Sequence, residues 1–224
     1  FGVTLTPRYC IVMERLEMTL YDRLHDEREF TWPAREHVAS DVAQGLAYLH
    51  GFCSEGRPTP IIHNDLKSSN ILLDRHYRAK LADFGFSKIR KEISTLSSVG
   101  GKGTPAWMAP EKLTETDPKK GQTKQSDIYS YGIVLWELIT RQLPFSHLEG
   151  NQMRILFALM EWLNGKSKHP LDNDIPKEAP TTLARLTRWC WDKDPSQRPT
   201  IEAVLKELGV QAAEDRQVKA PSVG

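Results

Sequence analysis

The first candidate for chemistry is the segment IIHNDLKSSNILLD, residues 61–74. It places Asp65, Lys67 and Asn70 on a short polar stretch between two apolar runs. Asn, Asp and Ser are ordinary turn formers, so a plain surface hairpin is one interpretation. The other is a site that handles a phosphate group and its metal ion, because magnesium prefers a few hard oxygen ligands together with phosphates.

A predicted helix precedes this segment and must help to position it. Thr31 is placed to cap the first turn, and Pro33 lies where a missing N–H costs nothing. Gly51 is placed as the stop at the other end. Apolar residues recur between them at three- and four-residue steps and predict one buried stripe: Val38, Val42, Leu46 and Leu49.

Further elements follow from the same patterns. Two strand segments around a Thr-Pro turn are expected in residues 1–14, and residues 53–60 are expected to form a loop. Residues 71–73 and 79–82 predict two short strands that flank a turn. Residues 85–103 predict a long loop, and loops of this length in compact domains are usually functional or mobile. Other helices are expected over residues 19–29, 125–141, 151–164, 181–191 and 199–208.

The composition is that of a globular protein of one domain. Of the 224 residues, 39% are hydrophobic and 26% are charged, and the formal net charge is +1. Such a balance lacks the concentrated positive field on which nucleic-acid binding relies, and no apolar run is long enough to span a membrane. The three cysteines, Cys10, Cys53 and Cys190, lie far apart without zinc-ligand spacing, which favours reduced thiols and a cytoplasmic location.

Three motifs now come together in order. HNDLKSSN is followed by LADFGFSK and then by GTPAWMAPE. In this order they resemble the catalytic loop, the metal-binding motif and the end of the activation segment of protein kinases. SDIYSYGIVLWEL and DPSQRPT match later parts of the family, so that the resemblance extends from about Tyr9 to Leu208. The Trp-Met of AWMAPE and the sequence SSNILL resemble those of the tyrosine-kinase-like group of Ser/Thr kinases.

The resemblance assigns roles to the polar residues. It makes Asp65 the catalytic base, which orients the substrate hydroxyl and accepts its proton, and places Lys67 beside the γ-phosphate. It makes Asn70 and Asp83 the magnesium ligands. The cofactors that it implies are ATP and Mg²⁺, and the implied partner is a protein substrate.

The resemblance also implies an adenine pocket. The stretch IVMERLEM is similar to the family's strand-to-hinge segment. Met13 would control the depth of the pocket, and the Glu14 carbonyl and the Leu16 backbone would bond the base. Leu72 would form the floor. Burial in a core is the plainer interpretation of Met13 and Leu72, and it is compatible with the pocket.

Two further pairs are expected to be architectural. By the same resemblance, Glu111 pairs with Arg198, and Asp127 anchors the catalytic loop backbone through His63. Loss of one partner of a buried ion pair is strongly destabilising.

One departure from the family pattern concerns regulation. The usual His-Arg-Asp reads His63-Asn64-Asp65, so that the arginine which pairs with an activation-loop phosphate is missing. We expect activity not to depend strongly on activation-loop phosphorylation, although four acceptors are present there: Ser94, Thr95, Ser97 and Ser98.

The expected fold is α+β and mainly α-helical, a kinase-like C-terminal lobe with short β-hairpins and a largely missing small lobe. Residues 1–16 would be remnant strands and the hinge, residues 17–210 the lobe, and residues 211–224 a flexible tail or linker. No glycine-rich loop or strand lysine is present to hold the α- and β-phosphates. We therefore expect the isolated chain to bind ATP poorly and to turn over negligibly.

The expected function is that of an ATP-dependent Ser/Thr protein kinase. Ser/Thr specificity is suggested by Lys67 together with Thr104 and Pro105. The alternative is a kinase-like scaffold or pseudokinase that binds without turnover. The combination of Asp65, Lys67, Asn70 and Asp83 favours the enzyme, because a scaffold has no chemical need for all four. The oligomeric state does not follow from the sequence.

Overall fold

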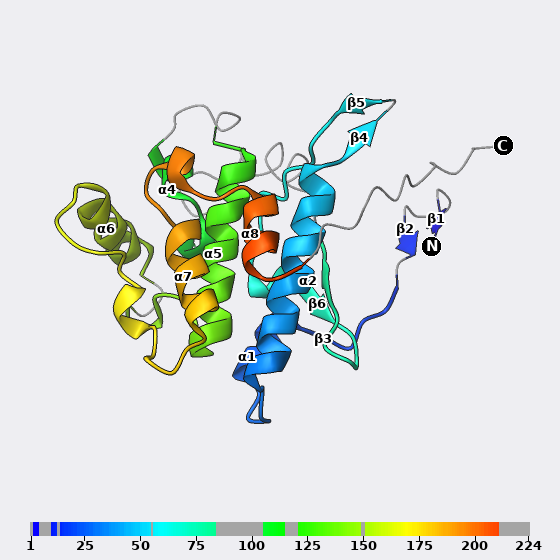
Figure 1. The fold of residues 1–224 in the computed structure, drawn as a ribbon, viewed down its shortest axis with the longest axis horizontal. Helices are drawn as coiled ribbons and strands as arrows, with labels where there is room; N and C mark the ends of the chain where they lie inside the picture. The colour runs from blue at the N-terminus through cyan, green and yellow to red at the C-terminus, as the bar shows by residue number, and fades with distance from the viewer. Residues whose placement is uncertain are drawn as a thin grey trace.

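Two long helices form the centre of the fold, α2 (Trp32–His50) and α5 (Lys124–Thr140), and they pack against each other (Figure 1). The structure is a computed structural model that describes residues 2–4, 10–12, 14–54, 56–83, 105–114, 121–148 and 151–210. Every residue of α5 from Ser126 to Ile139 is buried, as expected for a helix that other elements surround. Thr123 starts it with a capping box to Ser126.

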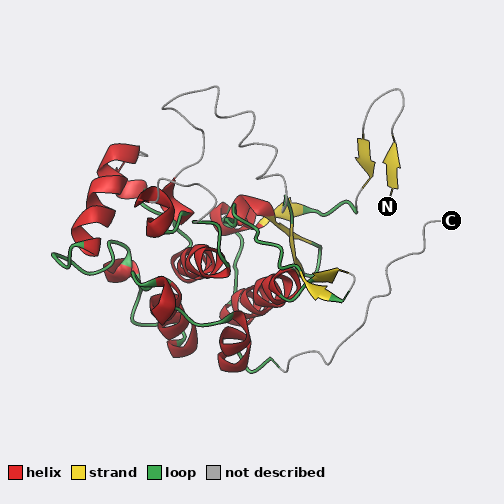
Figure 2. Ribbon diagram, turned by 90° about the horizontal axis from the view of Figure 1, so that it is seen from above, coloured by secondary structure: helices red, strands yellow, loops and turns green. Residues whose placement is uncertain are grey.

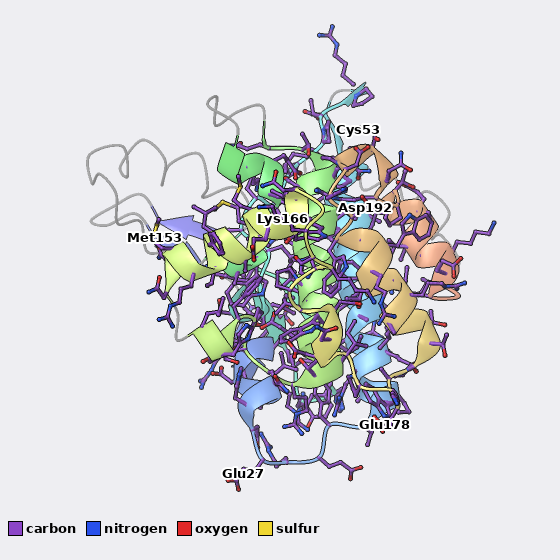
Figure 3. All side chains as sticks on the ribbon, turned by 90° about the vertical axis from the view of Figure 1, so that its left-hand side faces the viewer. Glu27, Cys53, Met153, Lys166, Glu178 and Asp192 are labelled. Atoms are coloured by element: carbon purple, nitrogen blue, oxygen red, sulfur yellow. The ribbon has the colours of Figure 1, made fainter. Side chains whose placement is uncertain are left out.

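The other helices pack around this pair. α7 (Thr181–Cys190) lies against α5 so closely that a side chain at Gly132 would meet Cys190 Cβ at 2.9 Å. α8 (Ile201–Glu207) packs on α2. α6 (Gln152–Leu163) lies on the outside of the molecule, where Figure 3 shows Met153, 73% exposed, at its first turn. Shorter still are α1 (Leu20–His25) and α4 (Pro110–Thr114).

A small antiparallel sheet lies beside α2 (Figure 2) and has the strand order β3-β6-β7. Its strands are β3 (Met18–Thr19), β6 (Ile71–Leu73) and β7 (Ala79–Leu81). The register pairs Thr19 with Leu72, and Ile71 with Leu81. β7 approaches α2 at Gly45, where a side chain would meet Leu81 at 3.0 Å.

Two separate hairpins complete the strands. β1 (Gly2–Thr4) pairs with β2 (Cys10–Val12), and β4 (Cys53–Ser54) pairs with β5 (Arg57–Pro58). Short 3-10 turns join the described elements: η1 (Ser68–Asn70), η2 (Pro105–Trp107), η3 (Ser146–Leu148), η4 (Asp172–Asp174) and η5 (Pro195–Gln197). No helix of the described residues is both long and apolar enough to cross a bilayer.

Most sequence-based expectations for the elements are confirmed. The structure is mixed α+β and mostly helical, and the helices predicted from residues 31, 125, 151, 181 and 199 begin within about two residues of these positions. The interpretation of residues 53–60 as a plain loop is wrong, because Gly56, at φ 73°, allows a tight hairpin there. The helix predicted over residues 19–29 is too long, because the chain turns extended at Asp26. Thr31 is the N-cap of α2, but its side chain makes no capping hydrogen bond.

Candidate active site

The polar segment after α2 brings three side chains together. Asp65 Oδ2 lies 3.1 Å from Lys67 Nζ. Asn70 Nδ2 donates to Asp65 Oδ2 at 3.0 Å and to the Asp65 backbone oxygen at 2.7 Å. The side chain of Asp65 is 39% exposed and that of Lys67 is 23% exposed, so both are open to a ligand. A plain surface hairpin would not need this cluster of an acid, a base and an amide.

The β6–β7 hairpin brings Asp83 to the same place. The antiparallel register extends beyond Ile71 and Leu81, because the Ala82 N–H donates to the Asn70 carbonyl at 2.9 Å. Asp83 is the next residue, and its side chain is exposed. Its φ of 60° is a backbone conformation that non-glycine residues adopt rarely and mostly at turns and functional sites. The sheet therefore holds Asp83 next to Asn70.

Asn70 and Asp83 have the donor chemistry of a magnesium site. The amide nitrogen of Asn70 is engaged with Asp65, which leaves its oxygen as the atom that would face a cation. No group of three or more His, Cys, Asp or Glu side chains that could hold a metal ion occurs in the described part of the chain. A cation here would thus take two protein ligands and complete its shell with phosphate and water oxygens, which is the arrangement that magnesium favours.

Asp127, near the start of α5, fixes the backbone of the segment that carries Asp65. Its side chain is fully buried and accepts hydrogen bonds from His63 N at 2.8 Å and Asn64 N at 2.9 Å. His50 Nε2 lies 2.9 Å from the same carboxylate. The expected anchoring of the loop backbone by Asp127 is confirmed, and His50 is a partner that the sequence did not indicate.

Asn64 occupies the position where the family usually has arginine. It adopts a left-handed conformation with φ 67°, which asparagine tolerates better than most residues. Its Nδ2 donates to Gln122 Oε1 at 3.3 Å, and its carbonyl accepts from Lys112 Nζ at 3.3 Å. The four acceptors of the long loop, and Thr104, lie outside the described residues.

The predicted pair Glu111–Arg198 is confirmed. Arg198 donates to both carboxylate oxygens of Glu111, at 2.7 and 2.8 Å, and its guanidinium lies over the ring of Tyr129. The Arg198 side chain is fully buried, whereas that of Glu111 is 24% exposed. This bidentate pair fixes α4 against the chain that leads into α8.

Of the residues predicted for adenine binding, Leu72 lies in β6, whereas Glu14 and Leu16 precede β3. Ile71 and Leu73 are buried in the core, so Leu72 lies on the opposite face of the sheet, where it is half-buried. Glu14 and Leu16 lead into β3, and Lys80 Nζ contacts the Glu14 carboxylate at 2.5 Å. Met13 lies outside the described residues.

The sequence did not single out Glu137 as part of the site, although it interrupts the most apolar helix. Glu137 is fully buried in α5 and accepts hydrogen bonds from Ser68 Oγ at 2.6 Å and Trp107 Nε1 at 2.7 Å. Burial raises the pKa of this carboxyl from its ordinary 4.5 to about 8, against the hydrogen bonds from Ser68 and Trp107, which lower it.

The raised pKa of Glu137 predicts a dependence of stability on pH. The folded chain binds this proton more tightly than the unfolded chain, so the stabilisation is complete below pH 4.5 and is lost as the pH rises to about 8. Glu137→Gln does not titrate at this position. In urea unfolding between pH 5 and 8, the free energy of unfolding of the unmodified protein should fall relative to that of E137Q, by at most about 1.4 kcal/mol per pH unit. Parallel curves for the two proteins would contradict this prediction.

Comparison with known proteins completes the description of the site. The family model "Protein kinase domain" matches residues 3–208. "Probable serine/threonine-protein kinase drkC" of Dictyostelium discoideum is 37% identical over 205 residues, 90% of this chain and 25% of the relative. "Serine/threonine-protein kinase CTR1" of Arabidopsis thaliana is 37% identical over 216 residues, 92% of this chain and 23% of the relative. "Dual specificity protein kinase shkD" of D. discoideum is 37% identical over 201 residues, with coverages of 88% and 24%. The chain thus spans about a quarter of the length of these relatives.

Proposed function

Because this chain belongs to the protein kinase family, we propose that it carries the catalytic lobe of an ATP- and magnesium-dependent Ser/Thr protein kinase of the tyrosine-kinase-like group. The observation that supports this most is the contact of Asp65 with both Lys67 and Asn70, beside the turn that carries Asp83. Residues 17–210 would form this lobe, residues 1–16 strands and the hinge, and residues 211–224 a flexible tail or linker.

The side chains would share the work of phosphoryl transfer. Asp65 orients the substrate hydroxyl and accepts its proton, while Lys67 faces the charge of the γ-phosphate. Asn70 and Asp83 would hold Mg²⁺, which when bound would neutralise phosphate charge. Glu14, Leu16 and Leu72, together with Met13, would contact the adenine.

The alternative is a kinase-like scaffold that binds but does not turn over. Lys67 lies 3.1 Å from Asp65, and both side chains are partly exposed. A binding module has no structural need for such a pair, because an exposed ion pair contributes little stability. One relative is named a dual specificity kinase. The test therefore has to identify which hydroxyl-bearing residue of the substrate is phosphorylated.

A transfer assay tests the proposal. The full-length protein would be incubated with γ-labelled ATP, Mg²⁺ and a mixture of unstructured proteins, and the label would be located by phosphoamino-acid analysis. We expect label on Ser and Thr, and its loss when EDTA removes Mg²⁺. Label on Tyr alone would contradict the specificity, and ATP binding without transfer would favour the scaffold.

A further inference from the structure

Glu137 joins two segments that lie far apart in the sequence. One carboxyl oxygen lies 2.6 Å from Ser68 Oγ and the other accepts from Trp107 Nε1 at 2.7 Å, so both oxygens are used. Ser68 and Glu137 are fully buried. The three side chains form a bridge through the core, and we call it the Ser68–Glu137–Trp107 bridge.

Each end of the bridge lies next to functional residues. Ser68 follows Lys67 directly and opens η1, the turn that ends at Asn70. Trp107 ends η2 and precedes Met108, whose side chain is 37% exposed. η2 belongs to GTPAWMAPE, the end of the activation segment, which in the proposed function faces the protein substrate.

α5 binds each of these segments separately as well. Asp127 holds the loop backbone at His63 and Asn64, and the Ser130 hydroxyl donates to the Trp107 carbonyl at 2.8 Å. In the part of α5 that the structure describes, Glu137 is the side chain that hydrogen-bonds to both segments at once. It is therefore the side chain through which a displacement of one segment reaches the other.

The bridge is not explained by stability alone. A carboxyl group in the middle of an apolar helix is costly to bury, and an apolar residue of similar size often stabilises such a site as well or better. Burial also leaves Glu137 without access to solvent or substrate, so it takes no direct part in the reaction. Its two directed hydrogen bonds do fix the distance between Ser68 and Trp107.

We propose that Glu137 is a positioning residue that couples the catalytic loop to the segment that receives the protein substrate. This inference rests on the proposed function. With the bridge formed, the hydroxyl of the bound substrate and Asp65 keep their relative position, which matters because a misplacement of about 1 Å costs about 10²-fold in rate. Glu137 therefore affects the reaction with the protein substrate, whereas other side chains hold the nucleotide.

Two substitutions separate the bridge from the fold. Glu137→Gln has the same shape, and its amide accepts from Trp107 and donates to Ser68, so that the bridge is kept. Glu137→Leu fills the same space and breaks both bonds without leaving a buried charge. In the full-length protein, E137L should raise KM for the protein substrate and lower kcat/KM about 10- to 100-fold, and E137Q should remain within about threefold. A purely structural role would lower only the amount of active protein and leave KM unchanged.

A mutant cycle tests the coupling itself. Ser68→Ala and Trp107→Phe each remove one end of the bridge and should each lower kcat/KM about tenfold, and the double variant should do no worse, because either change breaks the link. In the E137L background neither should lower kcat/KM further by more than about twofold. Effects of Ser68→Ala and Trp107→Phe that multiply in the presence of Glu137 would overturn the proposal.

Hydrogen exchange gives a readout that does not need activity. Trp107→Phe should speed exchange of the backbone amides of residues 65–71 when Glu137 is present and should have no effect in E137L. Ser130→Ala is the matched control, because it removes a bond from α5 to Trp107 but leaves the bridge intact. Exchange that is coupled in a protein without kinase activity would refute the proposed function and keep the bridge. Exchange that does not respond to Trp107→Phe would overturn the bridge.

Discussion

Asp65→Asn is expected to lower phosphoryl transfer to protein about 10²- to 10⁴-fold, the usual contribution of a general base. The amide keeps an oxygen that accepts from Asn70, but it has no negative charge for Lys67 and cannot take a proton. Initial rates with saturating Mg²⁺ and ATP would measure the loss. Binding of ATP should change little, because Asp65 acts on the acceptor hydroxyl.

Asp174→Asn is the matched control for this experiment. Asp174 is exposed in η4 and lies far from the site in the sequence. Its replacement by asparagine removes the same charge as Asp65→Asn. It should retain full activity, and both variants should melt within about 3 °C of the unmodified protein, since exposed substitutions change stability by about 0.5 kcal/mol or less. A D65N protein that retains more than a third of the rate would remove Asp65 from its proposed role.

Asp127→Ala is expected to destabilise the protein by about 3–5 kcal/mol. The carboxylate is fully buried and accepts from His50 and from the backbone of His63 and Asn64. Its removal leaves the buried donors of His50 and His63, and the partly buried Asn64 N–H, without this acceptor. Urea unfolding at constant pH would measure the loss as a lower midpoint. Because the loop that carries Asp65 loses its support, the rate of transfer should also fall at temperatures where the variant is folded.

Asp127→Asn separates the two effects. Its amide oxygen still accepts from one backbone N–H, while its NH₂ faces a second donor, so we expect about half the loss of stability seen with alanine. An alanine variant within about 1 kcal/mol of the unmodified protein would show that the loop does not depend on this carboxylate.

The sequence by itself determined the local features. The apolar stripe of α2 and the continuous apolar character of α5 depend on residues a few positions apart, and both helices form where they were expected. The order of HNDLKSSN, LADFGFSK and GTPAWMAPE was enough to identify the family, because each motif is short and its residue types are fixed by the chemistry. The architectural pairs Glu111–Arg198 and Asp127–His63 came from the same resemblance.

Other contacts that depend on tertiary packing could not be predicted from the sequence. The β4–β5 hairpin has strands of two residues, too short for any alternation to show. The pairing of β6 with β7 decides that Asp83 lies beside Asn70, and the approach of α5 to η1 and η2 decides that Glu137 meets Ser68, 69 positions away, and Trp107. The sequence shows Glu137 only as a polar residue within an apolar helix. Its partners could not be predicted, because hydrogen bonds between residues far apart in the chain produce no periodic pattern in the sequence.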